Sequence, residues 1–372
     1  MVVINCVRVP VAFIALLTLF VVTSGAFGAD HNLGNETFNT VQSEPARTGP
    51  DDPNLLAPVL PGDSKFWVPP EDRTACLESS WNTELTIERR VEGWERRNPA
   101  LQFIQDNSDN LGSAINNKDF RIGEYVKDVV NAASSRAYTE MDWGFSGGGS
   151  PGFMSSLILI SMSYTVSLFD QNNVWTQSQR NSVVKWGNIL ERNLEDRRSY
   201  SSMDSYAGFA ASRMAWGAVT QQPSIFQYGL KDFHRVAGHI KDNGLIETNL
   251  RDNNESVQFL VLAAEVATQN GIPAYDFKYG GKTIVDAVMS HTKHSHINPR
   301  RKWTESEGST PMSYVRRSGF VTHIAWAPVF ISRFPDHPAS QGLRELVARA
   351  RGVAISGTSM GGNTECLWGP RG

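Results

Sequence analysis

The sequence has little net charge, few cysteines and no series of residues that alternate between apolar and polar. Its 35 Lys and Arg residues nearly balance 38 Asp and Glu residues, so the 372-residue chain has a formal charge of -3. This small charge excludes a long-range electrostatic attraction to nucleic acid or to an anionic membrane. A polyanionic ligand could therefore bind only at a local basic cleft. The 40% of hydrophobic residues exclude a disordered or collagen-like chain. The missing alternation favours an all-α fold.

The first 28 residues have the pattern of a secretory signal peptide. Arg8 is the only charged residue before Asp30, residues 9–22 are apolar, and Ala26-Phe27-Gly28 supplies small residues at the two cleavage-site positions. An uncleaved anchor is the alternative, but this apolar stretch is short for a membrane span of about 20 residues. We therefore expect a periplasmic or secreted protein that has no membrane segment after cleavage.

Cleavage leaves two cysteines, Cys76 and Cys366, because Cys6 lies in the signal peptide. An oxidising compartment permits a disulfide between them, and two free buried thiols are the alternative. Such a bridge would stabilise the fold by at most about 5 kcal/mol, through its constraint on the unfolded chain.

Composition divides the mature chain into a leader and one domain. Residues 29–70 are rich in Asn, Thr, Pro, Gly and Asp, which predicts an extended or mobile leader. Residues 71–372 contain pairs of helical segments, in which a nearly all-apolar segment precedes one with a single apolar stripe. The pairs are 154–169 with 176–194, 206–219 with 223–240, 257–267 with 282–291, and 320–331 with 341–351. This pattern predicts inner and outer helical hairpins that form an α/α toroid (incomplete α/α barrel), with an open solenoid as the alternative.

Four segments resemble, in order, the α/α-toroid alginate lyases of the poly-mannuronate lyase type. They are Asp204-Ser205-Tyr206, residues 241–251 (KDNGLIETNLR), residues 262–267 (LAAEVA) with Asn270-Gly271, and residues 326–335 (WAPVFISRFP). The resemblance covers about residues 134–335. It implies the toroid fold and β-elimination on an acidic, uronic-acid polysaccharide such as alginate, without a cofactor.

The elimination must neutralise the sugar carboxylate, remove the C5 proton and protonate the departing O4. The family uses an Asn-His pair at the start of the second inner helix, an Arg after an Asp-Gly-Leu-like turn, and a Tyr two turns beyond it. Arg251 matches this Arg, and a guanidinium is suited to bidentate pairing with a carboxylate. Met203-Asp204 stands where the family has Asn-His, and Gln258 lies seven residues after Arg251, where the Tyr is expected.

Two residues at the mouth of an inner helix are candidates to replace the missing groups. Tyr206 is our candidate for base and acid, with its pKa lowered from about 10 by Arg213 or Arg251; a core tyrosine is the alternative. Asp204 is our candidate to orient the substrate or act as base, and its alternative role is the N-cap of helix 205–219.

The other polar residues are predicted to bind substrate or to be solvated. Arg300, Arg301, Lys302 and Trp303 form a basic and aromatic stretch, which supplies local positive charge and a ring to stack on a sugar; a solvated loop is the alternative. Trp143, beside a glycine run, is predicted to belong to a lid or else to a plain connector. Glu247 and Asn254 complete the predicted substrate-binding set.

The histidines supply no predicted metal ligand or base. His234 and His239 are five residues apart on an outer helix, so we expect them on a solvated surface. His291, His294 and His296 lack an accompanying Cys or HExxH motif, so no metal is predicted.

Two other functions fit the same residues. A glycoside hydrolase on the same toroid would use Asp204 and Glu247 as acid and base. A periplasmic polysaccharide-binding or assembly protein would keep the cleft without the chemistry. The lyase is our first prediction, as a monomer whose partner is an acidic polysaccharide and not nucleic acid or a membrane.

Overall fold

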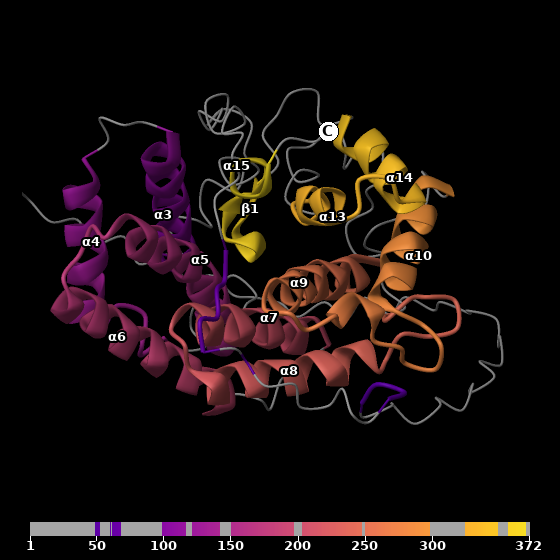
Figure 1. The fold of residues 1–372 in the computed structure, drawn as a ribbon, viewed down its shortest axis with the longest axis horizontal. Coiled ribbons are helices and arrows are strands. Elements are labelled where there is room, and N and C mark those ends of the chain that lie inside the picture. Colours follow the sequence, from indigo (N-terminus) through magenta and orange to yellow (C-terminus); the bar gives the residue numbers. More distant parts are fainter. Residues whose placement is uncertain are drawn as a thin grey trace, which may run out of the picture. The chain divides into compact units, whose positions relative to one another are not determined.

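Helices form nearly all of the regular structure in the described part of the computed structural model (Figure 1). The structure describes residues 49–52, 60, 62–67, 99–116, 121–141, 150–196, 203–247, 250–297, 324–348 and 356–369, all within the unit Pro45–Gly372. The all-α prediction is confirmed. The elements are α3 (Pro99–Asn116), α4 (Ile122–Ser134), α5 (Pro151–Asn172), α6 (Gln177–Asp196), α7 (Met203–Val219), α8 (Pro223–Ala237), α9 (Leu250–Gln269), η3 (Ala274–Asp276), α10 (Ile284–Ile297), α13 (Ala327–Arg333), α14 (Pro338–Ala348), β1 (Ser356–Gly357), η4 (Thr358–Met360), β2 (Gly362–Asn363) and α15 (Thr364–Trp368).

The inner helix α5 is buried on every side. From Pro151 to Phe169 only Phe153 is not fully buried. The helix begins where Ser150 accepts the N–H of Phe153 and proline occupies the first turn. This helix is long and apolar enough to cross a membrane, but 94% of its apolar stretch is buried inside the protein, as in the core helix of a globular domain.

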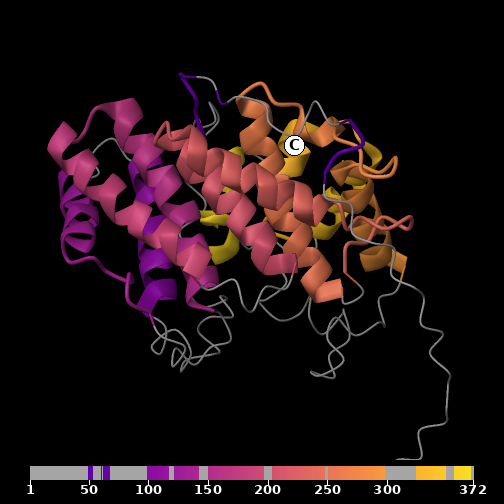
Figure 2. The same ribbon diagram turned by 90° about the horizontal axis from the view of Figure 1, so that it is seen from below.

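The outer helices bury one stripe each. In α6 the buried side chains step by three and four positions, and those of α8 follow the same period. The stripe of α6 consists of Val183, Trp186, Leu190 and Leu194. Figure 1 shows α4, α6 and α8 outside α5, α7 and α9, and the view from below shows the helices following one another in chain order (Figure 2). The predicted layers of inner and outer helices are therefore present.

Helices α7 and α8 approach closely at two glycines. A Cβ atom on Gly217 would lie 2.5 Å from the backbone nitrogen of Phe226, and one on Gly229 would lie 2.7 Å from that of Met214. Backbone atoms cannot yield to such a contact, so a larger residue would push the helices apart. The close packing sets the position of the carboxyl end of α8 against the amino end of α7.

Residues 62–67 close one end of the helical array. They have no helix or strand, yet Phe66 and Trp67 are fully buried, so this described part of the predicted leader is packed. Its hydrogen bonds reach the carboxyl ends of three inner helices. They join Trp67 to Ser167 and Gln171 of α5, Ser64 to Ala218 of α7, and Lys65 to Asn270 after α9. The three helices therefore run in the same direction, and their amino ends lie at the opposite end of the array.

The C-terminal residues 356–369 also pack at the closed end. Trp67 donates its indole N–H to the Leu367 carbonyl over 2.6 Å, and Trp368 donates to the Tyr164 hydroxyl over 2.9 Å. Cys366 is buried and disulfide-bonded. Cys76 lies outside the described residues, so its pairing with Cys366 stays a prediction, as do the domain boundaries at residues 28 and 70.

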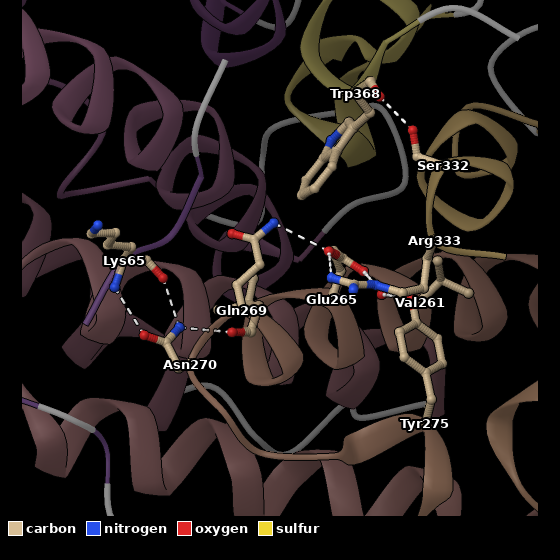
Figure 3. A network of polar contacts seen from close by, with 10 residues as sticks. Lys65, Val261, Glu265, Gln269, Asn270, Tyr275, Ser332, Arg333 and Trp368 are labelled. Carbon is tan, nitrogen blue, oxygen red and sulfur yellow. Dashed lines mark hydrogen bonds and ion pairs between the residues drawn. The ribbon is translucent and has the colours of Figure 1, made fainter. Parts of the chain in front are cut away.

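Two of the family-like segments meet in this closed end (Figure 3). Glu265 of α9 accepts two hydrogen bonds from the guanidinium of Arg333 at the end of α13, one of them over 2.9 Å. Gln269 donates to the same carboxylate, and Ser332 bonds to the Trp368 carbonyl. These motif residues therefore hold helices together, away from the amino ends of α7 and α9.

Candidate functional site

The candidate site lies where the amino ends of α7 and α9 meet the carboxyl end of α8. We refer to this region as the open mouth. Asp204 and Tyr206 come from the first turn of α7, and Glu247 lies in the turn before α9. Arg251 belongs to the first turn of α9 by its backbone, and its side chain lies outside the described atoms. The fold thus brings together the turns that carry the predicted catalytic residues.

Tyr206 lies beneath a guanidinium at the open mouth. Its side chain is 5% exposed, and Cζ of Arg235, near the end of α8, lies 3.7 Å from the centroid of its ring. This is a close cation–π contact that involves an exposed arginine. A ligand that contacts Arg235 from this side therefore lies close to Tyr206.

Arg213, one of the two cations named as able to lower the pKa of Tyr206, has carboxylate partners in the structure. Arg213 is fully buried and bonds to Glu191 of α6 over 2.8 Å and to Asp232 of α8 over 2.7 Å. A buried guanidinium needs such partners to offset the loss of its hydration. Arg213 therefore ties α7 to two outer helices.

Asp204 and Glu247 interact electrostatically at the open mouth. Burial raises the pKa of Glu247, and the negative charges of Asp204 and Asp252 raise it further, whereas Lys241 and a hydrogen bond from the Met203 backbone lower it. Asp204 is half-exposed, and its carboxylate accepts the N–H of Ser205 in the first turn of α7. Helix α7 begins at Met203, so Asp204 lies inside the first turn and is not the N-cap of a helix 205–219, although its negative charge still favours this end of the helix.

A buried amide, Asn253, holds the turn before α9. Its Oδ1 accepts the backbone N–H of Ile246 over 2.8 Å and that of Glu247 over 3.1 Å. Its Nδ2 lies 3.3 Å from Nδ1 of His291 on α10. Because the two N–H groups orient the amide, Nδ1 of His291 must accept, and a neutral His291 carries its proton on Nε2.

Asn254, predicted to bind substrate, is buried beside this amide. Its Oδ1 accepts the indole N–H of Trp326 over 3.0 Å, which links α9 to the residue before α13. The ring of Trp326 in turn lies 6.0 Å from that of His291. This contact gives Asn254 a role in joining the helices that surround the open mouth.

His234 does not lie on a solvated surface, so that prediction is wrong. It is 2% exposed, its Nδ1 lies 2.6 Å from the Tyr279 hydroxyl, and its ring stacks on Phe277. The segment after η3 covers this face of α8, which the helical period alone does not reveal. His239 lies past the end of α8 and is half-buried; burial lowers its pKa, and the positive charges of Arg235 and Lys241 lower it further.

Sequence reasoning missed Arg235, Lys241 and Asn253 as parts of this site. The sequence pattern predicts Arg235 and Lys241 to be ordinary solvated charges of an outer helix and of the turn that follows it. The signal for Asn253 is the pair of short amides at the start of an otherwise apolar helix, since buried amides usually hold a backbone segment.

Several predicted residues stay untested. Trp143, Arg300, Arg301, Lys302 and Trp303 lie outside the described residues. Within the described ranges, no three His, Cys, Asp or Glu side chains are grouped as metal ligands.

Comparison with known proteins agrees with the fold and adds the family. The family model for alginate lyase matches residues 94–303, which is more than half of the chain. No protein of curated function matches the chain by sequence.

Solved structures of alginate lyase A1-III resemble the chain throughout most of its length. The enzyme from Sphingomonas species A1 aligns with a TM-score of 0.57 at 16% identity over 72% of this chain and 75% of that chain. A histidine-to-alanine variant in its apo form aligns with a TM-score of 0.59 at 16% identity, over 88% of this chain and 86% of that chain. The same variant complexed with a tetrasaccharide aligns with a TM-score of 0.59 at 17% identity, over 73% of this chain and 77% of that chain. These alignments confirm the predicted α/α toroid, and with the family model they show that the chain belongs to the alginate lyase family, the polysaccharide lyases that cleave alginate by β-elimination.

Proposed function

We propose that the chain cleaves a uronic-acid polymer such as alginate at the open mouth, with Tyr206, Arg251 and Asp204 as the reacting and orienting groups. The observation that carries this proposal is the position of Tyr206 on the amino end of the second inner helix, beneath Arg235 and next to the turn that leads into Arg251. Tetrasaccharide complexes of alginate lyase A1-III support an acidic oligosaccharide as the ligand class.

The proposed reaction is a proton-balanced β-elimination. Arg251 pairs with the carboxylate of the reacting uronate and stabilises the charge that develops when C5 loses its proton. Tyr206, as phenolate, takes the C5 proton; the C4–O bond breaks as the C4–C5 double bond forms, and the phenol then protonates the departing O4. The enzyme ends each turnover with Tyr206 again deprotonated.

A cation covers the ring of Tyr206 at the open mouth. Cζ of Arg235 lies 3.7 Å from the Tyr206 ring centroid, so a uronate carboxylate held beside this ring also lies beside Arg235. Asn253 acts indirectly, because it holds the turn that sets the start of α9 and hence the position of Arg251.

A glycoside hydrolase is the second candidate, and one observation favours it. Glu247 has a raised pKa and interacts with Asp204. A carboxyl group with a raised pKa is the usual acid of glycoside hydrolysis, and a second carboxyl group nearby serves as base or nucleophile.

A product assay separates these functions. The mature protein is incubated with mannuronan, guluronan, glucuronan and mixed alginate, and both ultraviolet absorbance of the unsaturated product and release of reducing ends are followed. We expect both signals to rise together. Reducing ends without absorbance would establish the hydrolase, and neither signal with measurable polymer binding would establish a binding protein.

The cellular setting belongs to the same proposal. The N-terminal pattern supports export to the periplasm or the medium, where an acidic polysaccharide is available, and the proposed site residues all come from one chain, as in a monomer. Determination of the N-terminus and mass of the exported protein tests the cleavage after residue 28.

A further inference from the structure

The basic side chains of Arg235, His239 and Lys241 form one cluster at the carboxyl end of α8. Arg235 lies in the last turn of α8, and His239 and Lys241 follow directly after the helix ends at Ala237. Burial lowers the pKa of His239, and the positive charges of Arg235 and Lys241 lower it further, so His239 lies within electrostatic reach of both. Arg235 and Lys241 are exposed and His239 is half-buried. The cluster therefore faces solvent beside Tyr206.

The donors of this cluster are available to a ligand. Among the described residues, the side chains of Arg235, His239 and Lys241 make no hydrogen bond and no ion pair within 4 Å; the ring of Tyr206 is the contact of Arg235. A guanidinium and an ammonium offer five and three N–H donors. By contrast, the arginines Arg213 and Arg333 both bond to carboxylates.

The acidic groups of the open mouth do not take up these donors. Asp204 accepts the N–H of Ser205, and Glu247 accepts a hydrogen bond from the Met203 backbone. Lys241 influences the pKa of Glu247 without forming an ion pair with it. Asp252 also raises the pKa of Glu247, so three carboxyl groups lie near the amino ends of α7 and α9.

We propose that Arg235, His239 and Lys241 form a subsite for the carboxylate of a uronate unit next to the one that reacts at Tyr206. The inference rests on the proposed function, since it concerns how the same polymer is held. A carboxylate accepts two N–H bonds from a guanidinium and one from an ammonium, and these charge-assisted bonds are the strong ones. The polymer then passes over the carboxyl end of the outer helix α8, and its binding to this subsite does not depend on the chemistry at C5.

The test measures binding separately from turnover. Titration calorimetry is carried out with a tetramannuronate and with its carboxyl-reduced, neutral counterpart, in a Tyr206→Phe background that keeps the ring beneath Arg235 but does not consume the ligand. The variants are Arg235→Gln, Lys241→Gln and the double variant. Lys127→Gln, an exposed lysine of α4 that changes the charge equally, is the matched control. Circular dichroism verifies that each variant is folded.

We expect each single variant to raise Kd for tetramannuronate about three- to tenfold at low salt and the double variant to raise it more, with a smaller effect at high salt. The neutral tetrasaccharide and the Lys127→Gln variant should show no change. The subsite is refuted if both single variants bind like Lys127→Gln, or if no uronate oligomer binds. Weakened binding in the variants, together with a wild-type protein that releases no unsaturated product, would uphold the subsite and refute the lyase proposal alone.

Discussion

The two ends of the helical array use polar groups differently. At the closed end, Lys65 bonds to Asn270 after the inner helix α9, and Trp67 bonds to Leu367 of the C-terminal residues. Glu265 and Arg333 form an ion pair there. At the open mouth, the side chains of Arg235, His239 and Lys241 make no hydrogen bond or ion pair with other described residues, and the carboxyl group of Glu247 has a raised pKa. Paired charges at the closed end join helices of the fold, whereas the charges of the open mouth are the ones that we propose bind a ligand.

The largest expected effect is at the open mouth. Tyr206→Phe should lower kcat/KM on the preferred uronan by about 100- to 10,000-fold, because the proton acceptor and donor is lost while the ring remains. The rate of increase in ultraviolet absorbance measures this, and circular dichroism verifies the helices. Tyr228→Phe, which changes an exposed tyrosine of α8, is the control. Full activity of the Tyr206→Phe variant would show that Tyr206 is a core residue. The open mouth would then lose its proposed catalytic role in the comparison with the closed end.

At the closed end the expected effect is on stability. Trp67→Ala should lower the free energy of unfolding by about 3–5 kcal/mol, because a fully buried indole and its bond to Leu367 are lost. Urea denaturation followed by circular dichroism measures the change, and Trp67→Phe should lose less. Uronan affinity of the folded variant should stay unchanged. A loss of affinity without a loss of stability would mean that the two ends do not divide these tasks.

An intermediate effect is expected where fold and site meet. Asn253→Ala leaves the buried N–H of Ile246 and the half-buried N–H of Glu247 without their acceptor, which should cost about 1–3 kcal/mol and raise KM through the position of Arg251. Hydrogen exchange at these two amides, together with steady-state kinetics, measures both effects. Asn243→Ala removes an exposed acceptor from the same turn and is the matched control. Equal effects of both variants would contradict the role of Asn253.

The smallest expected effect concerns Glu247 and pH. A raised pKa means that the folded protein favours the neutral acid, so this stabilising contribution is complete below the ordinary pKa of glutamate and is lost as pH rises through the raised value. Glu247→Gln should therefore be at least as stable as the wild type at pH 7 and no more stable near pH 4. Thermal unfolding at the two pH values measures this. A variant that is less stable at pH 7 would show that the negative charge of Glu247 favours the fold.

The helical layers could be predicted because burial leaves a period in the sequence. Residues 154–169 are apolar on all faces and form a helix surrounded by others, whereas residues 176–194 carry one stripe and form a cover. Their boundaries agree with α5 and α6 within a few residues. Arg251 was identified by the family resemblance alone, because the apolar segment 257–267 begins only after the first turn of α9 (Leu250–Gln269).

The neighbours of the site residues could not be predicted, because they come from other elements. Arg235 reaches Tyr206 because α8 runs back along α7, whereas the sequence analysis named only Arg213 and Arg251 as cations for this tyrosine. The side chains of His291 and Asn253 form a hydrogen bond although they are 38 residues apart in the sequence. His234 is buried by a segment near Tyr279 that its own helical period does not indicate.

The sequence by itself determined the class of fold, the order of inner and outer helices and the family, because these depend on the apolar period and on local motifs. Tertiary structure alone decided which charges are paired. Arg213 and Arg235 lie on neighbouring helices and look alike in the sequence, yet one is buried between two carboxylates and the other is exposed above a tyrosine. The physical reason is that the cost of an unpaired charge depends on its burial, and burial is a property of the packed helices.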